Sequence, residues 1–131
     1  MFIGYNPNPV RADSVGDCAI RAIAKALDVT WEQAYAKLSA TGFVMGDMPN
    51  SDAVIAAVLR QNGFKRGTVD ESCPDCYTVE DFAKDHPVGV YVVKSDNHVA
   101  TIIDGNLFDA WDSSDRIPLW YWEKQTERNE Q

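Results

Sequence analysis

The chain has 131 residues, 45% of them hydrophobic and 24% charged, a balance typical of one globular domain with its own core. Twenty acidic against twelve basic residues give a formal net charge of -8, which argues against nucleic acid as a partner because phosphate contacts need clustered lysine and arginine. No apolar run is long enough to span a bilayer, and the N-terminus lacks the basic start and apolar stretch of a signal peptide. We therefore expect a single cytoplasmic domain over residues 1–131, with no membrane partner.

The first two thirds of the chain favour helices. Residues 1–14 are rich in asparagine and proline and are expected to run extended across the surface. Residues 17–27 place apolar side chains on one helical face, with Gly16 and Asp17 typical of a tight turn and an N-cap. Further helices are predicted over residues 31–40 after Thr30, residues 52–61 after Ser51 or Asn50, and residues 79–86 between Thr78 and Pro87, with a loop at residues 41–50.

From residue 89 the apolar pattern changes from helical to alternating. Four short strands are predicted, over residues 89–94, 98–104, 107–112 and 117–122, with a hairpin turn around Asp104, Gly105 and Asn106. Residues 123–131 are polar and are expected to fray. This order predicts an α+β fold in which N-terminal helices pack on a small C-terminal antiparallel sheet.

Cys18 occupies the first position of the first predicted helix. Unpaired backbone N–H groups and the helix dipole favour an anion there, so a thiol ionises more easily, and the thiolate is the nucleophilic form. Taken alone, Cys18 is more simply explained as a small buried residue that packs at a helix start.

The other two cysteines form the motif CPDC, with Cys73 and Cys76 at the spacing of half a zinc site or of a redox pair. No second such pair exists, and an odd number of cysteines does not form a disulfide framework. We therefore expect a plain loop, reduced thiols, no metal and no cofactor.

A cysteine nucleophile needs a base and a third group that orients the base. Of the two histidines, His86 precedes a proline at a helix end and is expected to be a solvated turn residue, whereas His98 opens a strand. Across a hairpin with a three-residue loop, His98 would face Asp112; with a two-residue loop the parity changes and Asp109 becomes its neighbour. We favour Asp112, although each aspartate alone is also consistent with a solvated strand residue.

A cysteine on the first helix, a histidine opening a later strand and an acidic residue on the next strand follow the chain order of papain-like cysteine peptidases, which residues 11–122 resemble. The run DCAIRAI is similar to the nucleophile motif of ovarian-tumour-type deubiquitinases, with matches at Cys18, Arg21 and Ala22. The stretch HVATIIDGNLFDAWDSS resembles the histidine hairpin of cell-wall peptidases and transglutaminase-like proteins. The whole chain looks like small papain-fold proteins of bacteriophages and prophages.

This resemblance implies a triad with Cys18 as nucleophile, His98 as general base and then acid, and Asp112 as orienting group. The chain departs from the family pattern at Ala12, where papain-like peptidases usually carry a glutamine that stabilises the oxyanion. Asn6, Asn8 and Ser14 are candidates for that role, beside the backbone N–H of Cys18. Asp17 is a second departure, because its charge opposes ionisation of the neighbouring thiol.

Two further residues are candidates for substrate contacts. Arg21 lies one turn after Cys18 and either pairs with Asp17 or Glu32 or guides a substrate carboxylate. Trp111 belongs to an aromatic stretch that either lines a peptide cleft or fills the core of the sheet.

The sequence thus predicts a thiol hydrolase, a peptidase or isopeptidase, that acts on a protein or peptide substrate through Cys18. Two alternatives remain open: an acyltransferase or cell-wall amidase with the same fold, and a non-catalytic phage-encoded protein that binds and inhibits a host factor. The phage resemblance would place the protein in the host cytoplasm.

Overall fold

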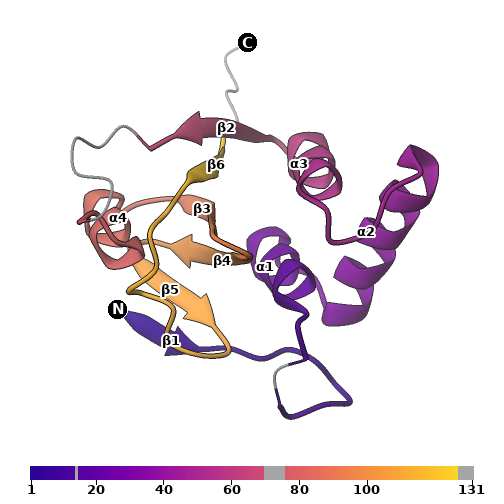
Figure 1. Cartoon of the computed structure of the whole chain (residues 1–131), viewed down its shortest axis with the longest axis horizontal. Helices are drawn as coiled ribbons and strands as arrows, with labels where there is room; N and C mark the ends of the chain where they lie inside the picture. Colours follow the sequence, from indigo (N-terminus) through magenta and orange to yellow (C-terminus); the bar gives the residue numbers. More distant parts are fainter. Residues whose placement is uncertain (14, 70–75, 127–131) are drawn as a thin grey trace.

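A six-stranded sheet runs through the part of the chain that the structure describes, residues 1–13, 15–69 and 76–126 of a computed structural model (Figure 1). The helices are α1 (Cys18–Leu27), α2 (Trp31–Met45), α3 (Asp52–Gln61) and α4 (Val79–Asp85). The strands are β1 (Phe2–Gly4), β2 (Phe64–Thr68), β3 (Val90–Ser95), β4 (His98–Ile103), β5 (Asn106–Asp109) and β6 (Trp120–Lys124). The α+β class predicted from the sequence is confirmed.

The sheet is larger than the sequence predicts and is not purely antiparallel. Its strand order is β1-β5-β4-β3-β6-β2, in which β1 pairs in parallel with β5 and the other neighbours pair antiparallel. The two strands that sequence reasoning missed, β1 and β2, lie at the two edges. Most of their residues are exposed, so neither carries a clear alternation of apolar and polar side chains.

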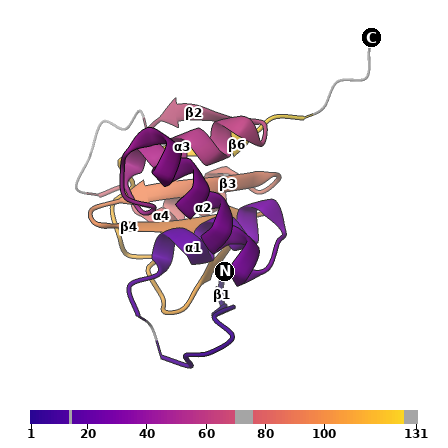
Figure 2. The same cartoon turned by 90° about the vertical axis from the view of Figure 1, so that its right-hand side faces the viewer.

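Helices cover both faces of the sheet (Figure 2). One face packs against the first three helices, through Ile23 of α1, Leu38 of α2 and Val58 of α3, which lie in one core cluster with Val92 and Val99. The opposite face packs against α4. Its cluster contains Phe82, Ala83, Tyr91, Val93, Ala100, Ile102 and Leu107. The hairpin of β4 and β5 therefore lies between α1 and α4.

Side-chain caps fix the starts of three helices as predicted. The hydroxyls of Thr30, Ser51 and Thr78 each accept a backbone N–H in the first turn of the following helix. The helix α2 continues to Met45, however, so residues 41–45 are not loop. Gly42 permits this extension because a Cβ at that position would lie 2.8 Å from the carbonyl oxygen of Asp47.

A buried hydrogen bond sets the position of α1 on the sheet. Thr101 of β4 is fully buried, and its hydroxyl donates to the carbonyl oxygen of Ala22 at 2.8 Å. Lys25 of the same helix lies over the ring of Phe108 of β5, 4.1 Å from its centroid. Together these contacts hold α1 against β4 and β5, the two strands that carry the polar residues described below.

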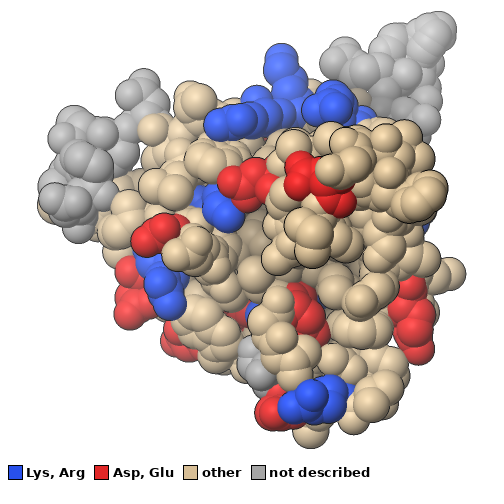
Figure 3. Space-filling model, turned by 45° about the vertical axis from the view of Figure 1, so that its right-hand side comes forward, with Lys and Arg blue, Asp and Glu red and all other residues tan. Residues whose placement is uncertain are grey.

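Charge is unevenly spread over the surface despite the acidic composition. Lysine and arginine gather along the β2 edge in Figure 3, where Lys65 and Arg66 are exposed, while acidic side chains are scattered below them. The guanidinium of Arg66 lies over the ring of Trp120 at 4.6 Å. Much of the centre of this face carries no charge, so apolar and neutral surface is available there for contacts.

Candidate active site

The structure brings Cys18 at the start of α1 to His98 at the start of β4. The thiol, the imidazole and Val99 line one cleft, and the interaction of the thiol with the imidazole lowers the pKa of Cys18 and raises that of His98. Cys18 is partly exposed and free, whereas His98 is buried. The two residues lie 80 positions apart in the sequence and meet because Thr101 holds α1 against β4.

Asp109 at the end of β5 holds the other side of the His98 ring. The Nε2 atom of His98 lies 2.6 Å from Oδ2 of Asp109, so Nδ1 is the ring nitrogen left for the thiol. Asp109 is only 1% exposed and also accepts hydrogen bonds from the Ser113 hydroxyl at 2.6 Å, from the backbone N–H of Ala110 at 2.8 Å and from Arg21. The carboxylate is therefore fixed in position on more than one side.

Asp112, which the sequence analysis favoured as the third residue, is not the partner of His98. In the hairpin, Ile103 pairs with Asn106 and Ile102 with Leu107, so the loop has two residues and not three. This register puts Asp109, and not Asp112, on the same side of the hairpin as His98. Asp112 is exposed and accepts a hydrogen bond from the backbone N–H of Ser114 at 3.1 Å, a turn contact.

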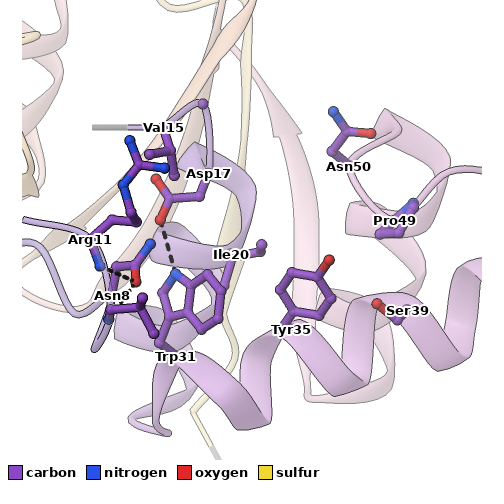
Figure 4. Close-up of a pocket in the computed structure, with 12 residues that line it drawn as sticks. Asn8, Arg11, Val15, Asp17, Ile20, Trp31, Tyr35, Ser39, Pro49 and Asn50 are labelled. Atoms are coloured by element: carbon purple, nitrogen blue, oxygen red, sulfur yellow. Dashed lines mark hydrogen bonds between the residues drawn. The ribbon is translucent and has the colours of Figure 1, made fainter. Parts of the chain in front are cut away.

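Arg21 links Asp109 to a second buried carboxylate. Its Nε and Nη2 atoms donate to Oδ1 of Asp109 at 3.3 and 3.1 Å, and its Nη1 atom donates to Asp17. The other oxygen of Asp17 accepts the indole N–H of Trp31 at 2.9 Å (Figure 4). Asp17 therefore stands at the N-cap position of α1 without capping it, and Arg21 offsets the charge that this carboxylate would exert on the thiol.

The pKa values of the three central groups shift in the directions that favour a thiolate and an imidazolium. Burial opposes ionisation of Cys18, but hydrogen bonds to His98 and from the Val99 N–H outweigh it, and the pKa is lowered. Burial also disfavours protonation of His98, yet its bonds with Asp109 and Cys18 raise the pKa to about 9. For Asp109, burial alone would raise the pKa, but hydrogen bonds from His98 and Ser113 outweigh burial, and the pKa is lowered overall.

Trp111, a candidate for substrate contact in the sequence, packs over the His98 ring. The two ring centroids lie 4.6 Å apart at an interplanar angle of 38°, and the guanidinium of Arg116 lies 5.1 Å from the Trp111 ring. Extending the β4–β5 register by two residues puts Trp111 opposite His98. The indole shields the ring and its hydrogen bond to Asp109 from water.

The structure does not bring the predicted oxyanion candidates to the thiol. Asn6 donates to the carbonyl of Ala12, and Asn8 accepts the backbone N–H groups of Val10 and Arg11, so both side chains organise the N-terminal loop. Ser14 lies outside the described residues.

Besides Cys18 and His98, the cleft around the thiol is lined by residues that sequence reasoning did not place there. It has a volume of about 160 Å³ and contains Cys18, His98, Gly16, Asn50, Lys94 and Asn97 among its lining residues. Lys94 pairs with Asp52 at 2.9 Å across this region. The sequence predicts Asn50 only as an alternative helix cap to Ser51, and no local pattern indicates a place beside Cys18.

Comparison with family models, with curated proteins and with solved structures finds no match. The geometry of the site is therefore the observation that bears on function.

The remaining titratable candidates do not join the site. His86 is half-buried and stacks on Phe82 with ring centroids 3.9 Å apart, so the expectation of a solvated turn residue is wrong. Cys76 is disulfide-bonded, which corrects the expectation that all thiols are reduced, and Cys73 lies outside the described residues.

Among residues 1–13, 15–69 and 76–126, no three His, Cys, Asp or Glu side chains are grouped to hold a metal ion. In the same residues, no helix has the length and apolar character to cross a membrane.

Proposed function

We propose that this protein is a cysteine hydrolase with a papain-like fold, and that it cleaves a peptide, isopeptide or related amide bond. One observation carries the proposal: the thiol of Cys18 shares a cleft with a histidine whose Nε2 atom is held by a buried carboxylate, and thiol and imidazole shift each other's pKa. A nucleophile, a base and an orienting group in this order are the requirements of covalent catalysis by a thiol.

The geometry supports a two-step mechanism. The Cys18 thiolate attacks the substrate carbonyl carbon, and the imidazolium of His98 gives its proton to the leaving amine as the C–N bond breaks. Neutral His98 then takes a proton from water as the water attacks the thioester carbonyl carbon. The C–S bond breaks, which releases the carboxylic acid and restores the Cys18 thiolate beside the His98 imidazolium. Throughout, Asp109 holds the imidazole orientation and stabilises its charged form.

The oxyanion of each tetrahedral intermediate needs hydrogen-bond donors. As the first residue of α1, Cys18 has a backbone N–H without an acceptor inside the helix, which supplies one donor. We assign the second donor to the side-chain amide of Asn50, which lines the same cleft as the thiol. It would take the place of the glutamine that the family carries where this chain has Ala12.

The papain-like part of the proposal rests on chain order and placement. The cysteine starts a helix that packs on the sheet, the histidine opens β4, and the aspartate ends the neighbouring strand β5. Papain-like peptidases have the same order of the three groups. In this chain Asp109, and not Asp112, corresponds to the third.

A single-turnover acylation experiment tests the proposed function. The protein is mixed with N-acetylglycine p-nitrophenyl ester, quenched in acid, and its intact mass and peptide map are measured. We expect one N-acetylglycyl group on Cys18, no adduct on Cys18→Ala, and slow adduct formation on His98→Ala, with His86→Ala as matched control. Decay of the adduct in water indicates a hydrolase. Decay that added glycinamide accelerates, and that is faster than decay of the same thioester in urea-unfolded protein, indicates an acyltransferase. If Cys18→Ala released p-nitrophenolate as fast as the unsubstituted protein, Cys18 would not be a nucleophile, and the non-catalytic binding protein would be favoured.

A further inference from the structure

We propose that the outer edge of β2 binds an extended acidic segment of a partner protein, which adds to the sheet as a further strand. β2 stands at one end of the strand order, whereas His98 opens β4, three strands away (Figure 1). The edge is therefore separate from the thiol cleft, and this inference does not depend on the proposed function.

The register between β2 and β6 determines which backbone groups of β2 face outward. The N–H of Gln125 donates to the carbonyl oxygen of Gly63 at 2.9 Å, directly before the first pair of the ladder. In an antiparallel ladder, residues that bond to the neighbouring strand alternate with residues whose N–H and C=O point the other way. The residues whose backbone groups point away from β6 are therefore Phe64, Arg66 and Thr68.

These outward groups are available to a further strand. In the sheet that the described residues form, no strand lies beyond β2. Within residues 1–13, 15–69 and 76–126, Phe64, Arg66 and Thr68 make no backbone hydrogen bond outside the ladder with β6. An extended peptide that pairs with these three residues would bind by β-strand addition, in which main-chain hydrogen bonds supply affinity.

Side-chain contacts hold β2 in place against β6. The ring of Tyr121 occupies the space that a Cβ of Gly67 would need, so the tyrosine packs across the strand. The guanidinium of Arg66 lies over the Trp120 ring, 4.6 Å from its centroid. Because the strand is ordered before a partner arrives, binding does not include the free-energy cost of ordering it.

The side chains along this edge are basic, although the chain has a net charge of -8. Lys65 and Arg66 of β2, Arg60 in the last turn of α3 and Lys124 at the end of β6 are all exposed, and Figure 3 shows lysine and arginine gathered along the edge. Among the ion pairs of the described residues, none includes any of these four side chains. Positive charge without a partner on an acidic protein favours an acidic ligand.

Backbone and charge together select the kind of partner. A second copy paired through β2 would place lysine and arginine against lysine and arginine, which is destabilising. A nucleic acid could neutralise the charge, but it has no alternating peptide N–H and C=O groups. An extended acidic peptide meets both requirements. Since neighbouring side chains of a strand point to opposite faces, one acidic residue would contact Arg66 and the next would contact Lys65.

Amide hydrogen exchange measured by NMR tests the backbone part of the inference. The probe is the peptide acetyl-Thr-Val-Glu-Glu-Val-Thr-amide, and its matched control carries Lys-Lys in place of Glu-Glu. In the free protein we expect the amides of Phe64, Arg66 and Thr68 to exchange faster than those of Lys65 and Gly67, which bond to β6. The acidic peptide should slow exchange of the first three at least tenfold more than that of the other two.

Exchange of charge between protein and peptide tests the acidic partner. We expect Lys65→Glu/Arg66→Glu to bind the acidic peptide at least tenfold more weakly in an NMR titration, and to gain binding of the Lys-Lys peptide. Lys37→Glu/Lys84→Glu changes the net charge equally at exposed positions of α2 and α4, and should bind the acidic peptide within about threefold of the unsubstituted protein.

The inference is overturned if the acidic peptide does not bind at millimolar concentration, or if the two sets of β2 amides are protected equally. Tighter binding of an oligothymidylate than of the peptide would overturn it in favour of a nucleic acid. Protection of the outward amides by raised protein concentration alone would overturn it in favour of a second copy. We expect Lys65→Glu/Arg66→Glu to leave the rate of Cys18 acylation within about twofold, so this inference and the proposed function can fail separately.

Discussion

Arg21 and Asp109 lie 88 residues apart in the sequence, and two hydrogen bonds, at 3.3 and 3.1 Å, join them inside the protein. Because Arg21 also binds Asp17, one buried guanidinium serves two buried carboxylates, and one of these holds His98. The stability of the fold and the orientation of the candidate base therefore depend on the same side chain.

Replacing Arg21 is expected to destabilise the protein strongly. Arg21→Met leaves two carboxylates buried without their cation, which costs about 3–5 kcal/mol in the free energy of unfolding. Urea denaturation followed by tryptophan fluorescence measures this difference. Arg11→Met is the control, because its pair with Asp13 is exposed and its loss is expected to be undetectable. Equal effects of the two substitutions would show that the buried network contributes no more to the free energy of unfolding than an exposed ion pair does.

Asp109 and Asp112 are distinguished by substituting each with asparagine. Asp109→Asn keeps the shape of the side chain but removes the charge that orients and stabilises the imidazolium, so we expect the rate of Cys18 acylation to fall by about 10²–10⁴-fold. Asp112→Asn changes only an exposed turn residue, and we expect a rate within about twofold of the unsubstituted protein. The reverse order would restore Asp112 as the third residue.

The Trp111 indole lies over the His98 ring and is expected to protect the hydrogen bond between His98 and Asp109 from water. Trp111→Ala admits water to the hydrogen bond between His98 and Asp109, which weakens it, and we expect acylation to slow about tenfold, the equivalent of one pKa unit. Trp111→Phe keeps a ring in place and should restore most of the rate. An NMR titration of the His98 ring provides the second readout. A His98 pKa unchanged in Trp111→Ala would contradict the shielding role.

The raised pKa of His98 predicts how stability depends on pH. The folded state binds this proton more tightly than the unfolded state, whose value is near 6.5. The contribution is therefore complete below about pH 6.5 and is lost as pH rises toward 9. The test compares Cys18→Ser with Cys18→Ser/His98→Gln, so that no thiol titrates at the site and the shift that remains comes from Asp109. We expect their difference in free energy of unfolding to shrink across this window. A difference that grows with pH would exclude a raised pKa.

Local signals in the sequence were sufficient where the physics is local. Thr30, Ser51 and Thr78 identify helix starts because a capping side chain bonds to backbone within three residues. The choice between Asp109 and Asp112 depended on one residue of turn length. Asp104 and Gly105 both adopt positive φ angles, 51° and 80°, a two-residue turn for which the Asp-Gly pair is a strong signal.

Contacts between distant segments carried no comparable signal. The two bonds from Arg21 to Asp109 depend on how α1 and the β4–β5 hairpin dock. Asn50 reaches the cleft only because the turn before α3 lies beside Gly16. The edge strand β2 was missed because pairing with β6, and not its own apolar pattern, makes it a strand.

The most direct test of whether His98 activates the Cys18 thiol is the pH dependence of alkylation by a low dose of iodoacetamide. Mass spectrometry measures the rate of Cys18 labelling in the unsubstituted protein and in His98→Ala. We predict faster and more selective labelling of Cys18 at pH 7 than of an ordinary cysteine, because its lowered pKa increases the fraction of thiolate. In His98→Ala the rate at pH 7 should fall at least tenfold and recover only toward pH 9. Two superimposable profiles, both rising near the pKa of an ordinary thiol, would contradict the account.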